Sequence, residues 1–105
     1  MYHLIFCTCP NAETARAIAH HLVTQQLAAC VNVLPGVTSI YRWQSQVETA
    51  EEHLLIIKSR QAAYDAIEAA IEQLHPYDVP EVIAVTLDRG SEDYLQWVGS
   101  CVAAR

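Results

Sequence analysis

With 105 residues, 52% of them hydrophobic and 17% charged, the chain has the length of one domain over residues 1–105. Its net charge of −6 argues against nucleic acid as a partner, because phosphate binding needs clustered Lys and Arg. No run of about 18 apolar residues predicts a membrane span. The N-terminus lacks the basic flank of a signal peptide, so we expect a cytoplasmic location.

Apolar patterns along the chain predict four strands and three helices. The expected strands span residues 2–8, 29–43, 47–58 and 81–87. The expected helices follow an N-cap at Asn11, span residues 61–74, and follow an N-cap at Ser91. Helical spacing places Val23 of the first helix and Leu74 of the second on inward faces.

This order of elements, βαββαβ with a C-terminal helix, predicts an α+β protein of the ferredoxin-like type. Right-handed crossovers give the strand order 4-1-3-2 with the helices on one face of the sheet. In this arrangement we expect the first strand to run parallel to the third and antiparallel to the fourth.

The second and third strands are long and are joined by a polar turn at residues 44–46, with a bend at Pro35-Gly36. A strand of 15 residues reaches about 50 Å, whereas a domain of this size has a radius of gyration near 13 Å. The hairpin must therefore overhang the core or bend sharply. An apolar overhang predicts self-association, and Tyr41 and Trp43 are expected in packing or in a subunit interface.

The segment His75-Pro76-Tyr77-Asp78-Val79-Pro80-Glu81 joins the second helix to the fourth strand. Its two prolines restrict the backbone, and its imidazole, phenol and carboxylates suit a functional site. A rigid connector with solvated charges is the alternative.

The expected strand directions gather titratable groups at one end of the sheet. These groups are Cys7, Cys9, Lys58, His75, Tyr77, Asp78 and Glu81, with Cys30 and Asn32 near the same edge. The hairpin turn is expected at the opposite end.

Thiolate and imidazole ligands suit copper or zinc. We expect Cys7 and His75 to be the first metal ligands, with Cys9 as a possible further one. The alternatives are buried free thiols and a histidine that satisfies helix carbonyls. Cys7 as a nucleophile with His75 as its base is also conceivable, but no catalytic or phosphate-binding motif supports a reaction. We therefore do not expect an enzyme.

Four separated motifs resemble the CutA family of divalent-cation tolerance proteins, in the family's order over nearly the whole chain. They are Ala28-Ala29-Cys30-Val31-Asn32, Pro35-Gly36-Val37-Thr38-Ser39-Ile40-Tyr41-Arg42-Trp43, Ile56-Ile57-Lys58 and the segment His75–Glu81. The stretch Tyr94-Leu95-Gln96-Trp97 is similar to the family as well.

The resemblance implies a single CutA domain and a homotrimer, similar to that of the PII signalling proteins, whose long hairpins pair between subunits. It also implies binding of divalent cations, copper above all, and a role in metal tolerance. By position, the family's copper-associated cysteine falls at Cys7 and its histidine at His75. Some members have two adjacent histidines where this chain has Leu74-His75, and Cys9 is unusual for the family.

The leading interpretation is therefore a trimer that binds copper, zinc or another divalent metal through Cys7 and His75, helped by Cys9 and Glu81. The alternative is a PII-like sensor or scaffold, which would bind a small ligand between subunits through Lys58, Tyr77 and Glu81.

Overall fold

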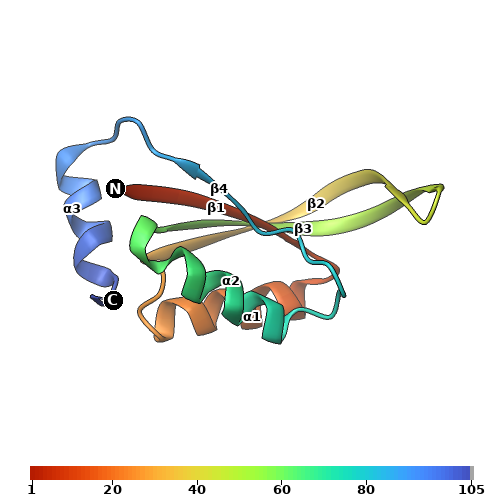
Figure 1. Cartoon of the computed structure of the whole chain (residues 1–105), viewed down its shortest axis with the longest axis horizontal. Coiled ribbons are helices and arrows are strands. Elements are labelled where there is room, and N and C mark those ends of the chain that lie inside the picture. Colours follow the sequence, from red (N-terminus) through yellow and green to blue (C-terminus); the bar gives the residue numbers. More distant parts are fainter. Residues whose placement is uncertain (105) are drawn as a thin grey trace.

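The computed structural model describes residues 1–104, which form one four-stranded sheet with helices packed against it (Figure 1). The elements in chain order are β1 (Tyr2–Cys9), α1 (Ala12–Thr24), β2 (Cys30–Trp43), β3 (Gln46–Arg60), the 3-10 turn η1 (Gln61–Ala63), α2 (Tyr64–Leu74), β4 (Ile83–Thr86) and α3 (Glu92–Cys101). The expected α+β, ferredoxin-like order is confirmed. No helix of the described residues is both long and apolar enough to cross a membrane.

The sheet has the strand order β2-β3-β1-β4, as expected, and every neighbouring pair is antiparallel. The expected parallel pairing of the first and third strands is wrong, because Cys7 lies opposite Leu55 and Cys9 opposite His53 in an antiparallel ladder. The connections explain this direction. Helix α1 returns the chain so that β1 and β2 run the same way, and β3, which lies between them, reverses after the hairpin.

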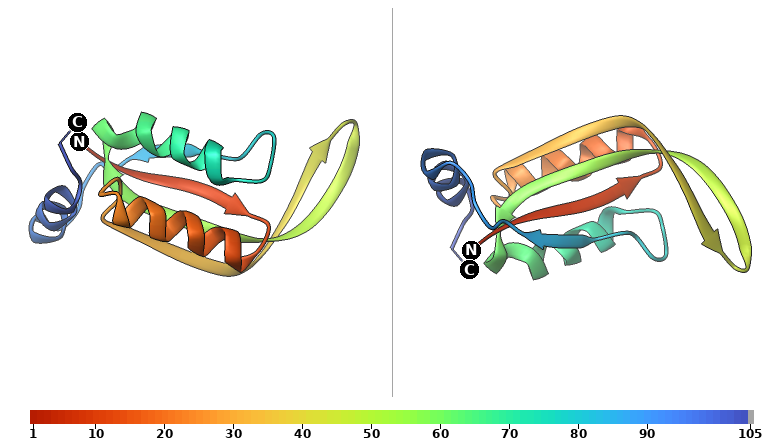
Figure 2. Two further views of the ribbon diagram at one scale, coloured as in Figure 1. Left: turned by 90° about the horizontal axis from the view of Figure 1, so that it is seen from below. Right: turned by 90° about the horizontal axis from the view of Figure 1, so that it is seen from above.

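Helices α1 and α2 cover one face of the sheet, and the other face is uncovered (Figure 2). The core lies between the helices and the covered face, where alternate residues of β1 and β3 are buried. The largest core side chains are Ile5, Ile18, Leu22, Leu55, Ile57, Ile67 and Ile71. Each such side chain stabilises the fold by about 1.5–3 kcal/mol when it leaves water.

Helices α1 and α3 each begin directly after the N-cap residue that the sequence predicts. The side chain of Asn11 accepts a hydrogen bond of 2.8 Å from the amide of Thr14, and Ser91 does the same for Tyr94 at 3.3 Å. Both predicted N-caps are confirmed. Val23 and Leu74 are each 43% exposed, so their predicted inward orientation is wrong. Val23 lies in the last turn of α1, and Leu74 is the last residue of α2. The helical periodicity continues to these positions, but the core does not extend that far.

The predicted ends of the four strands lie within two residues of the observed ends, and the second helix starts three residues later than expected. The helix expected over residues 61–74 begins with η1, and only Tyr64–Leu74 is α-helical. The strand expected over residues 81–87 is limited to Ile83–Thr86. These four residues are the ones that pair with His3 to Phe6 of β1.

The β2–β3 hairpin extends beyond the end of β1 as an arm (Figure 1). The register of the two strands shifts between Leu34 and Val37, and Gly36 there has φ of 75°. This bulge confirms the predicted bend. The arm gives the molecule extents of 44 × 26 × 21 Å and a radius of gyration of 14.1 Å, so the predicted overhang is confirmed.

Candidate metal centre

Cys7 and Cys9 occupy alternate positions of β1 on the face that the helices cover. Strand β1 stays regular through Cys9, so both side chains point into the core beside Ile5, and all three residues are 0% exposed. Both thiols are free. Their burial alone fits the interpretation of Cys7 and Cys9 as packed hydrophobic residues.

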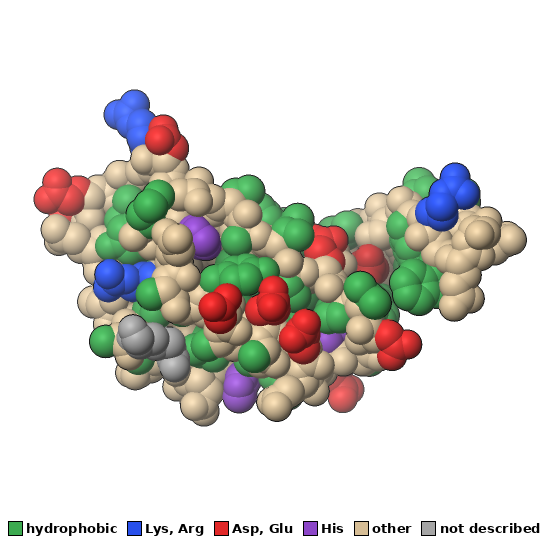
Figure 3. Space-filling model, viewed as in Figure 1, with side chains coloured by type: hydrophobic (Ala, Val, Ile, Leu, Met, Phe, Trp, Pro, Cys, Tyr) green, Lys and Arg blue, Asp and Glu red, His purple; other side chains and the backbone are tan. Residues whose placement is uncertain are grey.

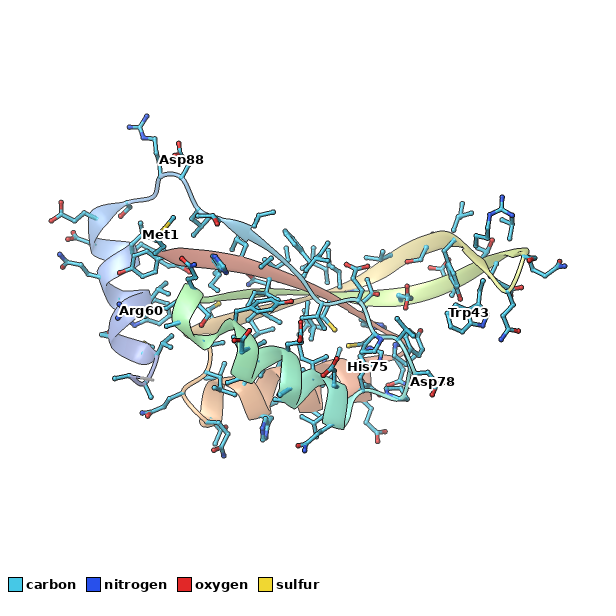
Figure 4. The ribbon with its side chains drawn as sticks, in the orientation of Figure 1. Met1, Trp43, Arg60, His75, Asp78 and Asp88 are labelled. Carbon is cyan, nitrogen blue, oxygen red and sulfur yellow. The ribbon has the colours of Figure 1, made fainter. Side chains whose placement is uncertain are left out.

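His75 reaches the two thiols from the end of α2. The helix ends there because Pro76 follows, and His75 has the extended backbone (φ −84°, ψ 139°) that precedes a proline. The imidazole is only 6% exposed. In Figure 4 it lies where the segment after α2 passes the end of β1.

Both ring nitrogens of His75 have backbone partners. The amide of Tyr77 donates to Nδ1 at 3.2 Å, so Nδ1 is an acceptor. Nε2, which lies 2.7 Å from the carbonyl oxygen of Thr8, must then carry the proton and donate it. His75 is thus a neutral imidazole. As one interpretation of the sequence expected, His75 binds a backbone carbonyl oxygen, but this oxygen belongs to Thr8 of β1 and not to helix α2.

The two thiols and the imidazole form one compact cluster. The Sγ atoms of Cys7 and Cys9 and a ring nitrogen of His75 all lie within 4.8 Å of one another. The interaction of the Cys7 thiol with the nearby Cys9 thiol, together with burial, raises the pKa of Cys7. The same interaction lowers the pKa of Cys9, because it stabilises the Cys9 thiolate.

The donor set of this cluster fits a soft or borderline metal ion. Metal-bound histidines usually donate their other ring N–H to a carbonyl or carboxylate, and the contact from Nε2 to Thr8 already has this form. Nδ1 would then be the metal ligand, at the loss of its 3.2 Å bond from the Tyr77 amide. Cys7, Cys9 and His75 are therefore the residues that could hold a metal.

Glu81 does not belong to the cluster. It lines a neighbouring cavity of about 680 Å³ between the body and the arm. Its negative charge contributes to the raised pKa of Cys7, although less than the neighbouring Cys9 thiol and burial do. Glu81 is thus near the cluster, and the geometry favours the two thiols over its carboxylate as ligands.

The cavity is acidic and aromatic. Its lining residues are Thr8, Ser39, Ile40, Tyr41, Trp43, Glu52, Pro76, Tyr77, Asp78, Val79 and Glu81. Figure 3 shows the hollow between the body and the arm, with acidic side chains at the base of the arm. Such a lining attracts cations.

Glu52, which lines this cavity, was not predicted from the sequence to belong to a site. Glu52 is 6% exposed and accepts a 2.8 Å hydrogen bond from the hydroxyl of Tyr77. Burial and this bond raise the pKa of Tyr77, because the ionised phenol would be poorly solvated beside a carboxylate. Glu52 is out of phase with the buried residues Leu55 and Ile57 of β3, so strand periodicity assigns it to the opposite face. Only the contact with Tyr77 marks it as buried.

Lys58 lies away from the cluster, which corrects the expectation that one end of the sheet holds all these groups. Lys58 pairs with Leu4 and with Cys30, toward the start of β1, and its Nζ lies 5.8 Å from the ring centre of Tyr94. Figure 4 shows Arg60, at the end of β3, far along the sheet from His75.

Because β1 and β3 are antiparallel, two further expectations about the sheet ends are wrong. Cys30 lies at the Lys58 end with the start of β2, and Asn32 is two residues farther along, opposite Ile56. The hairpin arm, expected at the far end, extends instead from the end that carries Cys9. The cluster therefore lies at the base of the arm.

The comparisons with known proteins agree with the resemblance seen in the sequence. The family model described as CutA1 divalent ion tolerance protein matches residues 3–101. The divalent-cation tolerance protein CutA of Thermus thermophilus is 44% identical over 98 residues, which are 93% of this chain and 95% of that protein. The human protein CutA is 44% identical over 93 residues; these cover 89% of this chain but only 52% of the human sequence.

Solved structures show the same fold. The divalent cation tolerance protein from Thermus thermophilus superposes with a TM-score of 0.96 at 42% identity, covering 98% of this chain and all of the other. The structure of CutA from Archaeoglobus fulgidus, which is described as a periplasmic protein, gives 0.95 at 32% identity, over 98% of this chain and 100% of the other.

Proposed function

Because the chain belongs to the CutA1 divalent ion tolerance protein family, we propose that it binds a transition-metal cation, copper or zinc, in metal tolerance. The observation that carries this proposal is the cluster of Cys7, Cys9 and His75, whose ligand atoms lie within 4.8 Å of one another. Thiolate and imidazole are ligands that copper and zinc share.

The burial of the cluster supports a binding role over a catalytic one. Cys7 is 0% exposed and its pKa is raised, whereas a nucleophilic cysteine needs an exposed thiolate. The chain is therefore proposed to act without catalysis. A cytoplasmic location stays a prediction.

A PII-like role in binding a small ligand has partial support. The cavity of about 680 Å³ brings Tyr77 and Glu81 together, as this alternative requires, but Lys58 lies elsewhere. Without that ammonium group the lining is acidic, with Glu52 and Asp78 beside Glu81. The cavity therefore suits a cation better than an anionic metabolite.

We expect zinc titration calorimetry under reducing conditions to detect binding that depends on the cluster. His75→Ala and Cys7→Ser should each weaken binding by about 100-fold or more, because even supporting groups around a ligand are worth about 10- to 100-fold. His20→Ala, which removes an exposed histidine of α1, and Lys58→Ala should leave the affinity unchanged. Equal binding by the wild type, His75→Ala and Cys7→Ser would reject this metal centre.

A further inference from the structure

We propose that the cluster of Cys7, Cys9 and His75 prefers Cu(I) over divalent cations, and that Cys9 is the residue that decides this preference. The inference rests on the metal-binding role proposed above and adds the oxidation state of the ion. It follows from the kind, number and burial of the ligands.

The ligands of the cluster are two sulfurs and one nitrogen. Among residues 1–104, this group contains no carboxylate, and the nearby acids Glu52 and Glu81 line the adjoining cavity. Sulfur ligands select soft ions such as Cu(I), whereas carboxylates select hard divalent ions. The cluster is therefore matched to a soft ion at its centre.

The number of ligands separates Cu(I) from zinc. Zinc is bound tetrahedrally, so in a site with three protein ligands it takes a fourth from water or substrate. Cys7 and Cys9 are 0% exposed and His75 is 6% exposed, so water has little access to a fourth position. Cu(I), a soft ion that accepts low coordination numbers, needs no such ligand.

The distances permit both sulfurs to bind one ion. Two sulfurs held at about 2.3 Å from a metal lie at most about 4.6 Å apart, and the cluster atoms already lie within 4.8 Å. Small side-chain rotations would close the site. Each bound thiol would release its proton to solvent, because the thiolate is the ligand.

Cys9 decides the preference because it turns a mixed site into a dithiolate. Without Cys9, the cluster would keep one sulfur and one nitrogen, and the next available donors would be the carboxylates of the cavity. Such a mixed set of S, N and O ligands no longer favours Cu(I) over divalent ions.

The acidic cavity lies next to the buried cluster. Thr8 lines the cavity, stands between Cys7 and Cys9 in β1, and accepts the hydrogen bond from His75. Glu52, Asp78 and Glu81 line the same cavity, and their charges would concentrate a cation next to Thr8.

The test is a competition experiment under nitrogen, in which Cu(I) is titrated against the chromophoric chelator bathocuproine disulfonate and Zn(II) against a zinc dye. We expect Cys9→Ser to lower the Cu(I) affinity by about 100-fold or more and the Zn(II) affinity by less. Cys30→Ser is the matched control, because Cys30 lies at the other end of the sheet, opposite Lys58, and should change neither affinity. Cys9→Ala repeats the test should the serine variant unfold.

X-ray absorption at the copper edge of the wild-type complex needs no variant. Two sulfurs and one nitrogen around copper support the inference, and a single sulfur overturns it. If Zn(II) binding depends on Cys7 and His75 while Cys9→Ser leaves Cu(I) affinity unchanged, the Cu(I) inference is wrong and the metal-binding function stands. If the wild type binds neither ion, both are wrong.

Discussion

His75 illustrates how a single side chain can join elements that are distant in the sequence. Its imidazole connects the end of α2 to the carbonyl of Thr8 in β1. The centroid of the imidazole ring lies 4.6 Å from the centroid of the Tyr77 ring. Tyr77 in turn reaches Glu52 of β3. One short proline-containing segment thus borders the cluster of Cys7, Cys9 and His75 on one side and the acidic cavity on the other.

The hydroxyl of Tyr77 donates the hydrogen bond that satisfies the buried carboxylate of Glu52. Tyr77→Phe should lower the free energy of unfolding by about 1–3 kcal/mol, because Glu52 would stay buried without its donor. The double variant Tyr77→Phe with Glu52→Leu should recover part of this loss. Urea unfolding of the two single variants and the double variant measures the coupling. Additive losses would show that the bond is not stabilising.

The same pair predicts alkaline sensitivity. The pKa of Tyr77 is raised in the folded protein above its ordinary value near 10. The bond therefore stabilises the fold fully below about pH 10, and this contribution is lost as the pH rises further, because the unfolded state releases the proton first. Unfolding experiments from pH 8 to 11 should show a steeper fall in stability for the wild type than for Tyr77→Phe.

Among the elements, the arm depends on backbone conformations that its residues adopt poorly. Gln44 and Ser45 form its turn with φ of 50° and 67°, and two positive φ values define a type I′ turn, for which Asn-Gly is the favoured pair. The polar residues predict a turn here, but they do not predict its type, because neither residue favours positive φ.

Replacing this turn by Gln44→Asn with Ser45→Gly should therefore stabilise the protein. A left-handed conformation costs an ordinary residue about 1–2 kcal/mol, and Gly avoids that cost. We expect a gain of about 1 kcal/mol in the free energy of unfolding, measured with denaturant. Ser45→Ala, which keeps the strain, serves as the control and should give no gain. An unchanged double variant would mean that the arm does not contribute to cooperative folding.

The molecule as a whole exposes several large apolar side chains that lie outside its core. Ile40 and Val47 on the arm are 71% and 66% exposed, Trp43 is 47% exposed, and Ile83 on β4 is 56% exposed. Exposed apolar side chains gathered on an extended arm are typical of an interaction surface. We propose that three copies assemble through the arms, as the resemblance to CutA proteins implies, with Tyr41 and Trp43 in the interface.

Light scattering at micromolar concentration should give about three times the chain mass of 11.7 kDa. Trp43→Asp or Tyr41→Asp should weaken assembly, because a buried unpaired carboxylate costs several kcal/mol. His20→Asp, on the exposed side of α1, should not. The melting temperature should rise with protein concentration if assembly is coupled to folding. A stable monomer of the wild type would contradict the interface.

Local residue patterns were sufficient to predict the element order, the two N-caps, the bulge near Gly36 and the strand order. Each depends on interactions within one helix, one turn or one crossover, whose rules are readable from neighbouring residues. Cys7, Cys9 and His75 were also candidates from their chemistry alone. However, their proximity was predicted from a parallel pairing of the first and third strands, which is wrong and which also placed Lys58 beside them.

Contacts between elements that are distant in the sequence determine which of these groups meet. The antiparallel register of β1 and β3 carries Lys58 and Cys30 away from Cys9 and brings the arm to it. The burial of Glu52 and the link between His75 and Thr8 likewise come from contacts between elements. Sequence periodicity shows which face of an element is apolar. It does not show which other element that face will contact, because contacts between residues far apart in the sequence depend on the packing of the whole chain.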